Sequence, residues 1–153
     1  MAEPSMIVVR CKNCLGLNRV PLNRIESKPH CGQCKTALDV PHAPSYATPA
    51  NIDREIAYWP ETLLLVFTST ANLYCKIYDA LAHDLAAERI GKLKVMMIDV
   101  DAEPYLAERY KVTTTPSFIV FRNGTMAIRL DGAPKDKNDF IKWVDNLMNY
   151  NSY

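Results

Sequence analysis

Four of the five cysteines of this chain form two closely spaced pairs near its start. Cys11 and Cys14 enclose two residues, and Cys31 and Cys34 enclose two more after an interval of 16 residues. Two intervening residues allow a tight turn that directs both sulfur atoms to one point, and Gly32 could supply a positive φ in the second turn. Two such turns provide the four thiolates that tetrahedral zinc prefers. The spacing therefore predicts one structural zinc ion, with no coordination position left open for catalysis.

The small size of the cysteine-containing segment also indicates a metal site. A segment of about 40 residues cannot bury enough apolar surface to fold alone, so a metal or disulfides must hold it together. Two disulfides or four unrelated thiols are the alternatives, and a reducing compartment would disfavour the disulfides. Residues 1–42 carry a net charge of +3 but contain no aromatic side chain that could stack on a base. We therefore do not expect nucleic-acid binding.

The composition is that of a globular protein with two parts. Of 153 residues, 48% are hydrophobic and 23% are charged, and the formal net charge is +1. No apolar run has the roughly 18 residues that a membrane span needs, and we expect no secretory signal and a cytoplasmic location.

Residues 41–50 are uncharged and rich in proline. They predict an extended linker between a zinc ribbon at residues 1–40, the head, and a body at residues 51–153. We expect changes in the head to leave the body folded.

Strand and helix patterns alternate along the body. Asn123 and Gly124 form the strongest short hairpin signal and join two apolar runs. The order of elements predicts an α/β fold in which a mixed central sheet has helices on both faces. The expected strands are 62–67, 93–98, 117–121 and 125–130, and the expected helices are 71–90, 103–110 and 137–148.

The helix expected at 71–90 has an apolar stripe with steps of three and four residues. We expect Gly91 to end this helix, and Lys92 and Lys94 to lie near the negative end of its dipole. The stripe consists of Tyr74, Ile77, Tyr78, Leu81 and Leu85.

The body resembles thioredoxin. The similarity lies in the order of elements, in Thr115-Pro116 before a strand and Gly132 after the next, and in the stretches 95–104, 107–112, 115–124 and 131–133. With the four-cysteine head in front, the chain is similar to the thioredoxin-2 type. The resemblance implies a thioredoxin-like fold after a small zinc ribbon, a cis peptide bond at Pro116, and a protein-binding groove built around Asn72, Thr115, Pro116 and Gly132.

The chain departs from the family where the family's redox chemistry lies. The family motif Trp-Cys-Gly-Pro-Cys-Lys aligns with residues 71–76, so Asn72 replaces the attacking cysteine whereas Cys75 and Lys76 retain the second cysteine and the lysine. The first cysteine attacks the substrate disulfide and the second resolves the mixed disulfide. An asparagine at the first position can instead cap the helix.

Three neighbouring departures agree with the loss of the attacking cysteine. The family's buried acid aligns with Val66, its partner lysine aligns with Met97, and an aromatic residue aligns with Thr68. Because the acid and the lysine are lost together, neither leaves an uncompensated buried charge.

Cys75 has two interpretations. It is either an inert thiol, shielded by Leu73 and Tyr74 in surroundings that disfavour the thiolate, or a monothiol activated by the helix N-terminus and Lys76.

The leading hypothesis is a divergent thioredoxin-2-like protein without dithiol cycling that binds a protein partner in its groove. The alternatives are a thiol–disulfide oxidoreductase or monothiol enzyme that uses Cys75, and a sensor in which oxidation of the head thiolates releases zinc. The sequence leaves open whether the protein is an enzyme and how it oligomerises.

Overall fold

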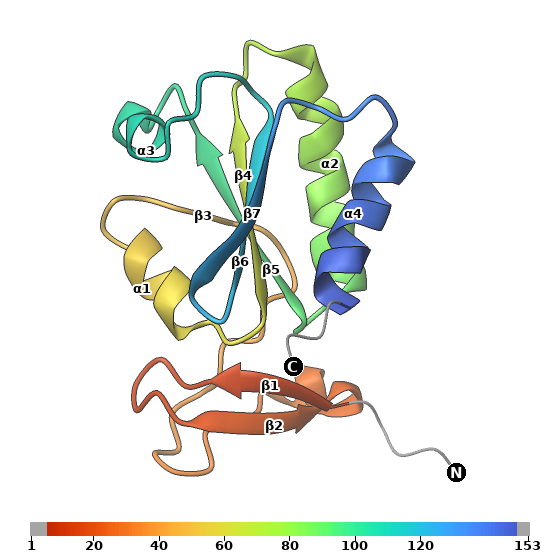
Figure 1. Ribbon diagram of the computed structural model, residues 1–153. Coiled ribbons are helices and arrows are strands. Elements are labelled where there is room, and N and C mark those ends of the chain that lie inside the picture. The colour runs from red at the N-terminus through yellow and green to blue at the C-terminus, as the bar shows by residue number, and fades with distance from the viewer. Residues whose placement is uncertain (1–5, 150–153) are drawn as a thin grey trace.

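A computed structural model describes residues 6–149 and shows a small head below a larger α/β body (Figure 1). The head contains an antiparallel pair of strands, β1 (Met6–Arg10) and β2 (Leu17–Pro21), followed by the 3-10 helix η1 (Leu22–Ser27). None of the helices in this part of the chain is both long and apolar enough to span a membrane.

The body is built on a five-stranded mixed sheet with the strand order β3-β5-β4-β6-β7. The first three strands in this order are parallel, and β6 and β7 are each antiparallel to the strand before them in the order. The strands are β3 (Ser45–Tyr46), β4 (Thr62–Thr68), β5 (Leu93–Asp99), β6 (Ser117–Arg122) and β7 (Thr125–Asp131).

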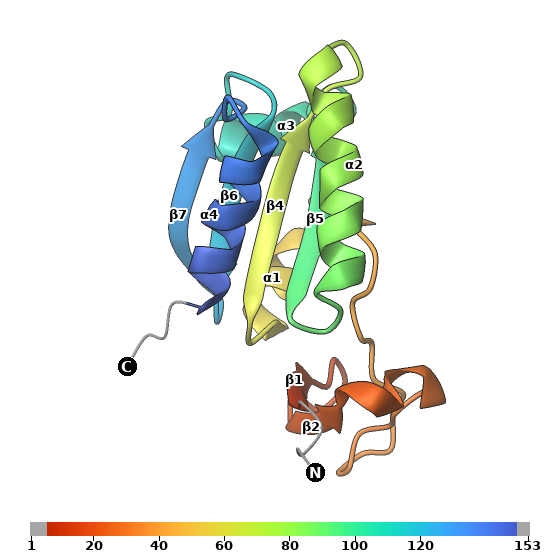
Figure 2. The ribbon, with the colours of Figure 1, turned by 90° about the vertical axis from the view of Figure 1, so that its right-hand side faces the viewer.

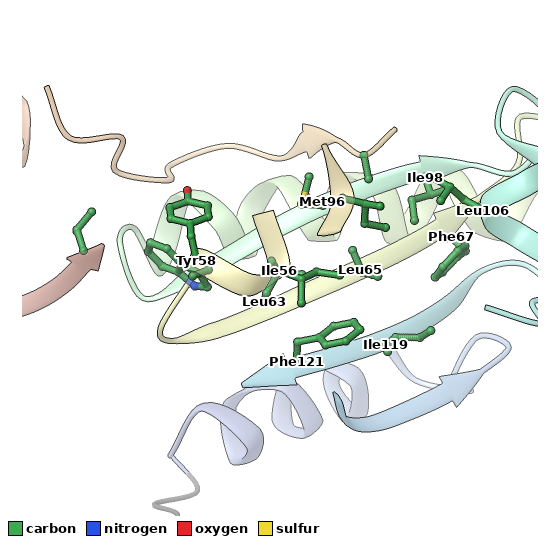
Figure 3. Close-up of a cluster of buried hydrophobic side chains, with 14 of the residues drawn as sticks. Ile56, Tyr58, Leu63, Leu65, Phe67, Met96, Ile98, Leu106, Ile119 and Phe121 are labelled. Carbon is green, nitrogen blue, oxygen red and sulfur yellow. The ribbon is translucent and has the colours of Figure 1, made fainter. Parts of the chain in front are cut away.

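Helices cover both faces of this sheet (Figure 2). On one face lie α2 (Leu73–Glu88) and α4 (Lys137–Asn149), and on the other lie α1 (Ile52–Tyr58) and α3 (Pro104–Arg109). Every residue of β4 is buried, which explains its uninterrupted apolar sequence. Alternate side chains of this strand enter two cores: Leu63, Leu65 and Phe67 face α1 and α3 (Figure 3), and Leu64 and Val66 face α2 and α4.

The predicted thioredoxin-like fold is confirmed, with differences in detail. The β6–β7 hairpin turns through Asn123 and Gly124, whose φ angles are 50° and 80°. The helix expected over 71–90 is shorter, and Gly91 lies beyond its end with a φ of 77°. The sequence patterns did not predict α1 or β3. Because β3 pairs with β5, the segment 41–50 contains part of the sheet and is more than a linker.

The head and the body share a hydrophobic core, although the sequence predicted two separate parts. Ile7 and Val9 of β1 belong to the same buried cluster as Ile52 and Trp59 of the body. This contact lies at the end of the sheet opposite the beginning of α2 (Figure 1). A structural change in the head can therefore affect the body through direct packing.

Candidate functional site

The four head cysteines lie together at the tips of two matching turns. Their sulfur atoms are all within 4.8 Å of one another, with 3.5 Å between Cys11 and Cys34 and 3.6 Å between Cys14 and Cys31. In each turn the N–H of the first cysteine donates to the carbonyl five residues later, at 2.9 and 2.8 Å. The arrangement offers four thiolate ligands to one tetrahedral metal ion.

Each of these turns needs one residue in the left-handed region, and neither uses Gly32 for it. The residues with positive φ are Leu15, at 65°, and Lys35, at 66°, each directly after the second cysteine of its pair. The expectation that Gly32 supplies this conformation was wrong. Its amide instead donates to the Asn18 side chain at 2.9 Å, which joins the second turn to β2.

Hydrogen bonds in the head favour thiolates at two of the cysteines. The Thr36 hydroxyl lowers the pKa of Cys34 to about 5, and backbone N–H groups of Cys34 and Gln33 lower the pKa of Cys31. A hydrogen bond with the Gly16 backbone lowers the pKa of Cys14, but sharing with neighbouring thiols outweighs it and raises that pKa to about 11. Thiolates this close repel one another, so a cation at their centre would be favoured. Such an ion would also keep its thiol ligands deprotonated.

At the opposite end of the body, Asn72 caps α2 and joins it to the loop before β6. Its side-chain oxygen accepts from the Tyr74 N–H at 2.9 Å, and its side-chain nitrogen donates to the Thr115 carbonyl at 2.6 Å. The peptide bond between Thr115 and Pro116 is cis, as the resemblance implied. The side chain at the family's attacking position therefore has two structural hydrogen bonds, and an amide is no nucleophile.

Beside Asn72 lies a groove that includes three of the predicted groove residues, Thr115, Pro116 and Gly132. Gly132 has a φ of 87° and nothing within 4 Å of the place where a Cβ would be, so its backbone angle rather than crowding requires glycine. One wall is fixed to α2 because the Tyr78 hydroxyl donates to the Pro134 carbonyl at 2.8 Å. The lining residues are Tyr74, Thr114, Thr115, Pro116, Gly132, Ala133, Pro134 and Lys135.

The first turns of α2 present an apolar surface next to this groove, which we call the α2 patch. It consists of Leu73, Tyr74 and Ile77, which are 75%, 64% and 51% exposed. Two of them, Tyr74 and Ile77, belong to the apolar stripe noted in the sequence, so part of that stripe faces outward. The buried face of α2 is instead formed by Cys75, Tyr78, Ala82, Leu85 and Ala86.

Cys75 points inward and is only 1% exposed. Its sulfur accepts a hydrogen bond from the Ser69 N–H at 3.4 Å. Leu73 and Tyr74, which were expected to shield it, lie at the surface of the same helix turn. A substrate disulfide has no direct access to this sulfur.

The positions of the family's acid and lysine are apolar and paired. Val66 and Met97 lie opposite each other in the β4–β5 register, and both are buried in the core beneath α2. No charged group takes the place of the proton acceptor at these two positions.

Sequence analysis missed Asp79, which lies one turn after Cys75. Its Oδ2 accepts from the Thr68 hydroxyl at 3.0 Å, and its Oδ1 is buried with no hydrogen-bond partner among the described residues. Burial raises the pKa of this carboxyl group, although the hydrogen bond from Thr68 opposes the shift. Only the polar character of Thr68 at the end of an apolar strand hinted at this pair.

Comparisons with known proteins agree with this architecture. The sequence profile of the thioredoxin family matches residues 43–146, and the profile of the thioredoxin 2 N-terminal zinc ribbon matches residues 10–36. The chain therefore belongs to the thioredoxin family. Within that family, it combines the thioredoxin domain with a four-cysteine zinc ribbon of the thioredoxin 2 kind.

Individual relatives support the same assignment. Thioredoxin C-3 of Corynebacterium nephridii is 27% identical over 160 residues, which cover 94% of this chain and 96% of that protein. The H-type thioredoxin of Chlamydomonas reinhardtii is 35% identical over 75 residues, which cover 49% of this chain and 66% of that protein. A mutant thioredoxin from Halobacterium salinarum NRC-1 has the same fold, with a TM-score of 0.63 at 20% identity over 72% of this chain and 96% of that one.

Proposed function

We propose that this chain is a zinc-containing thioredoxin-family protein that binds a protein partner in the groove beside Asn72 and does not perform dithiol–disulfide cycling. The observation that carries the proposal is the position of Asn72. Its amide occupies the place of the attacking thiolate and is held by Tyr74 and Thr115. Without that thiolate no mixed disulfide forms at the surface, and Cys75 has no second sulfur in α2 to pair with.

Zinc fits the head because the donor set is four cysteine thiolates with two-residue spacing and because the head matches a zinc-ribbon profile. With all four positions filled, the ion would hold the head together and take no part in a reaction. Unpaired cysteines suit a reducing compartment, so we propose a cytoplasmic location.

The groove and the α2 patch supply the surface for a partner. Leu73, Tyr74 and Ile77 expose apolar area directly beside the groove lined by Pro116 and Gly132. Exposed apolar groups that adjoin a concave, largely preformed surface are typical of protein-binding sites. The partner would therefore bind by apolar contact, without a covalent step.

A monothiol role for Cys75 is the second candidate, because the Ser69 N–H at 3.4 Å would stabilise a thiolate. Its 1% exposure opposes this role, since an attacking sulfur must reach the substrate. A third candidate, a sensor in which oxidation of the head thiols releases zinc, is supported by the short sulfur–sulfur distances in the head.

The groove proposal is tested by affinity capture of partners in excess reductant. Proteins retained by the wild type should be lost with Tyr74→Asp, which places a charge in the patch and groove. They should be kept with Met126→Asp, a matched change at an exposed apolar residue of β7. They should also be kept with Cys75→Ser. Capture that requires Cys75 would contradict the proposal and favour the monothiol enzyme.

A further inference from the structure

A cluster of charged side chains joins the head to the body. Lys12, in the first cysteine turn, places its Nζ 3.0 Å from Asp39 Oδ2 and 3.0 Å from Glu55 Oε1. The other oxygen of Glu55 accepts from Lys94 of β5 at 2.6 Å, and Lys94 also donates to the Tyr58 hydroxyl at 2.6 Å. Glu55 of α1 is thus held by one lysine from the head and one from the sheet.

The inner part of this cluster is deeply buried. The side chains of Glu55 and Lys94 are 10% and 6% exposed, whereas the Lys12 side chain is 38% exposed. Buried charges are costly unless they are paired with good geometry. Lys12 is therefore the outer member of the cluster. It can be substituted without leaving Glu55 unpaired, because Glu55 and Lys94 form a buried pair at the centre.

The position of Lys12 depends on the metal site. It lies between Cys11 and Cys14, and the surrounding turn is closed by the hydrogen bonds Cys11 N–H to Gly16 O and Leu15 N–H to Cys11 O, both 2.9 Å. A segment as small as the head buries little apolar surface of its own, so a bound metal would help to hold these turns in place. An ion that fixed these turns would also hold the Lys12 ammonium group toward Glu55.

Apolar packing and a backbone hydrogen bond provide a second connection. Ile7 of β1 packs so closely on Gly91 that a Cβ at that glycine would lie 2.3 Å from Ile7 Cδ1. The Gly91 N–H donates to the Pro41 carbonyl at 2.9 Å. Trp59, at the end of α1, is 1% exposed in the core cluster that contains Ile7.

We propose that metal bound by the four cysteines stabilises the body through the Lys12–Glu55 contact, so that the metal-loaded head and the body unfold as one cooperative unit. When the metal leaves, the first cysteine turn loosens, Lys12 leaves Glu55, and the body loses part of its stability. The residues that line the groove belong to the beginning of α2, the loop before β6 and the segment after β7. These parts meet at the end of the sheet away from the head (Figure 1), so the metal sets the stability of the body rather than the shape of the groove.

The two tryptophans allow a direct test, because both lie in the body and the head has no aromatic residue. Urea unfolding of the full chain is followed by tryptophan fluorescence under reductant, with zinc bound and after zinc is removed by a chelator. Zinc removal should lower the urea midpoint of the body. With zinc bound, Lys12→Met should raise the equilibrium constant for unfolding about three- to tenfold, between the effects of an exposed ion pair and a charge-assisted hydrogen bond. Without zinc, Lys12→Met should have no effect.

Lys35→Met is the matched control. Lys35 lies in the second cysteine turn, as Lys12 lies in the first, and its side chain donates to the Gly32 carbonyl at 3.1 Å, within the head. Its replacement removes the same charge near the metal and should leave the body midpoint unchanged in both states. An identical midpoint for the wild type with and without zinc would overturn the proposal. An equal effect of Lys12→Met in the two states, or of Lys35→Met and Lys12→Met with zinc bound, would overturn it as well.

Discussion

Replacing Asn72 by alanine removes two interactions of different kinds. The side-chain oxygen caps α2 through the Tyr74 N–H, and the side-chain nitrogen donates to the Thr115 carbonyl in the loop before β6. Alanine keeps the backbone of the cap but can make neither hydrogen bond. The change therefore measures how much the Asn72 side chain contributes to the stability of the fold.

The expected loss follows from these two hydrogen bonds. An N-cap replaced by alanine costs about 1 kcal/mol, and a typical intramolecular hydrogen bond contributes about another 1 kcal/mol. The free energy of unfolding should thus fall by about 2 kcal/mol. For a protein of this length, that corresponds to a decrease in Tm of about 4–8 °C.

Two further variants separate the contributions. Asn72→Ser retains a cap acceptor and loses the donor to Thr115, so its loss should be about half as large. Asp136→Ala is a matched control for capping alone, because the Asp136 carboxylate accepts from the Asn138 N–H at 2.8 Å at the start of α4. The assay is thermal and urea unfolding of the metal-loaded protein. A loss for Asn72→Ala no greater than that for Asp136→Ala would refute a bridging role for Asn72.

Two other predictions concern the head and the core. Freshly prepared reduced protein should contain one zinc ion per chain, and Cys31→Ser should lose it; elemental analysis without zinc in the wild type would contradict this. Asp79→Asn should stabilise the protein at pH 7 by at most about 1 kcal/mol after allowance for solvent screening. Burial raises the pKa of Asp79 in the folded state, so the stabilisation from its bound proton is present at acid pH and lost as the pH rises through that pKa. The advantage of the variant in urea unfolding should therefore shrink as the pH falls through that raised pKa and be lost by about pH 4, and equal stability at pH 7 would contradict the prediction.

The parts of the fold that follow local rules could be predicted from the sequence. The apolar run of β4 reflects burial on both faces, and Asn123-Gly124 sets the β6–β7 turn through positive φ angles. The cysteine spacing brings the four sulfurs together because each pair closes its own turn. In each case, residues that are close together in the sequence determine the local structure.

The missing parts depend on contacts between distant segments. The helix α1 is only seven residues long, and its Glu55 is buried because Lys94 meets it from 39 positions further along the chain. Lys94 lies in β5, within the expected strand 93–98, but its ammonium group binds Glu55 instead of remaining near the end of the helix dipole. The side of α2 that faces the core also depends on tertiary packing, which is why the apolar stripe alone did not show that Tyr74 and Ile77 face outward.

The central claim is tested most directly by catalytic reduction of a protein disulfide, with an external thiol supplied as reductant. The wild type should not exceed the background rate, and Cys75→Ser should behave identically. Asn72→Cys should form a disulfide with Cys75 and gain turnover, although only part of the family's activity, because Val66 and Met97 provide no proton acceptor. Robust turnover by the wild type that Cys75→Ser abolishes would contradict the account and identify the protein as a monothiol enzyme.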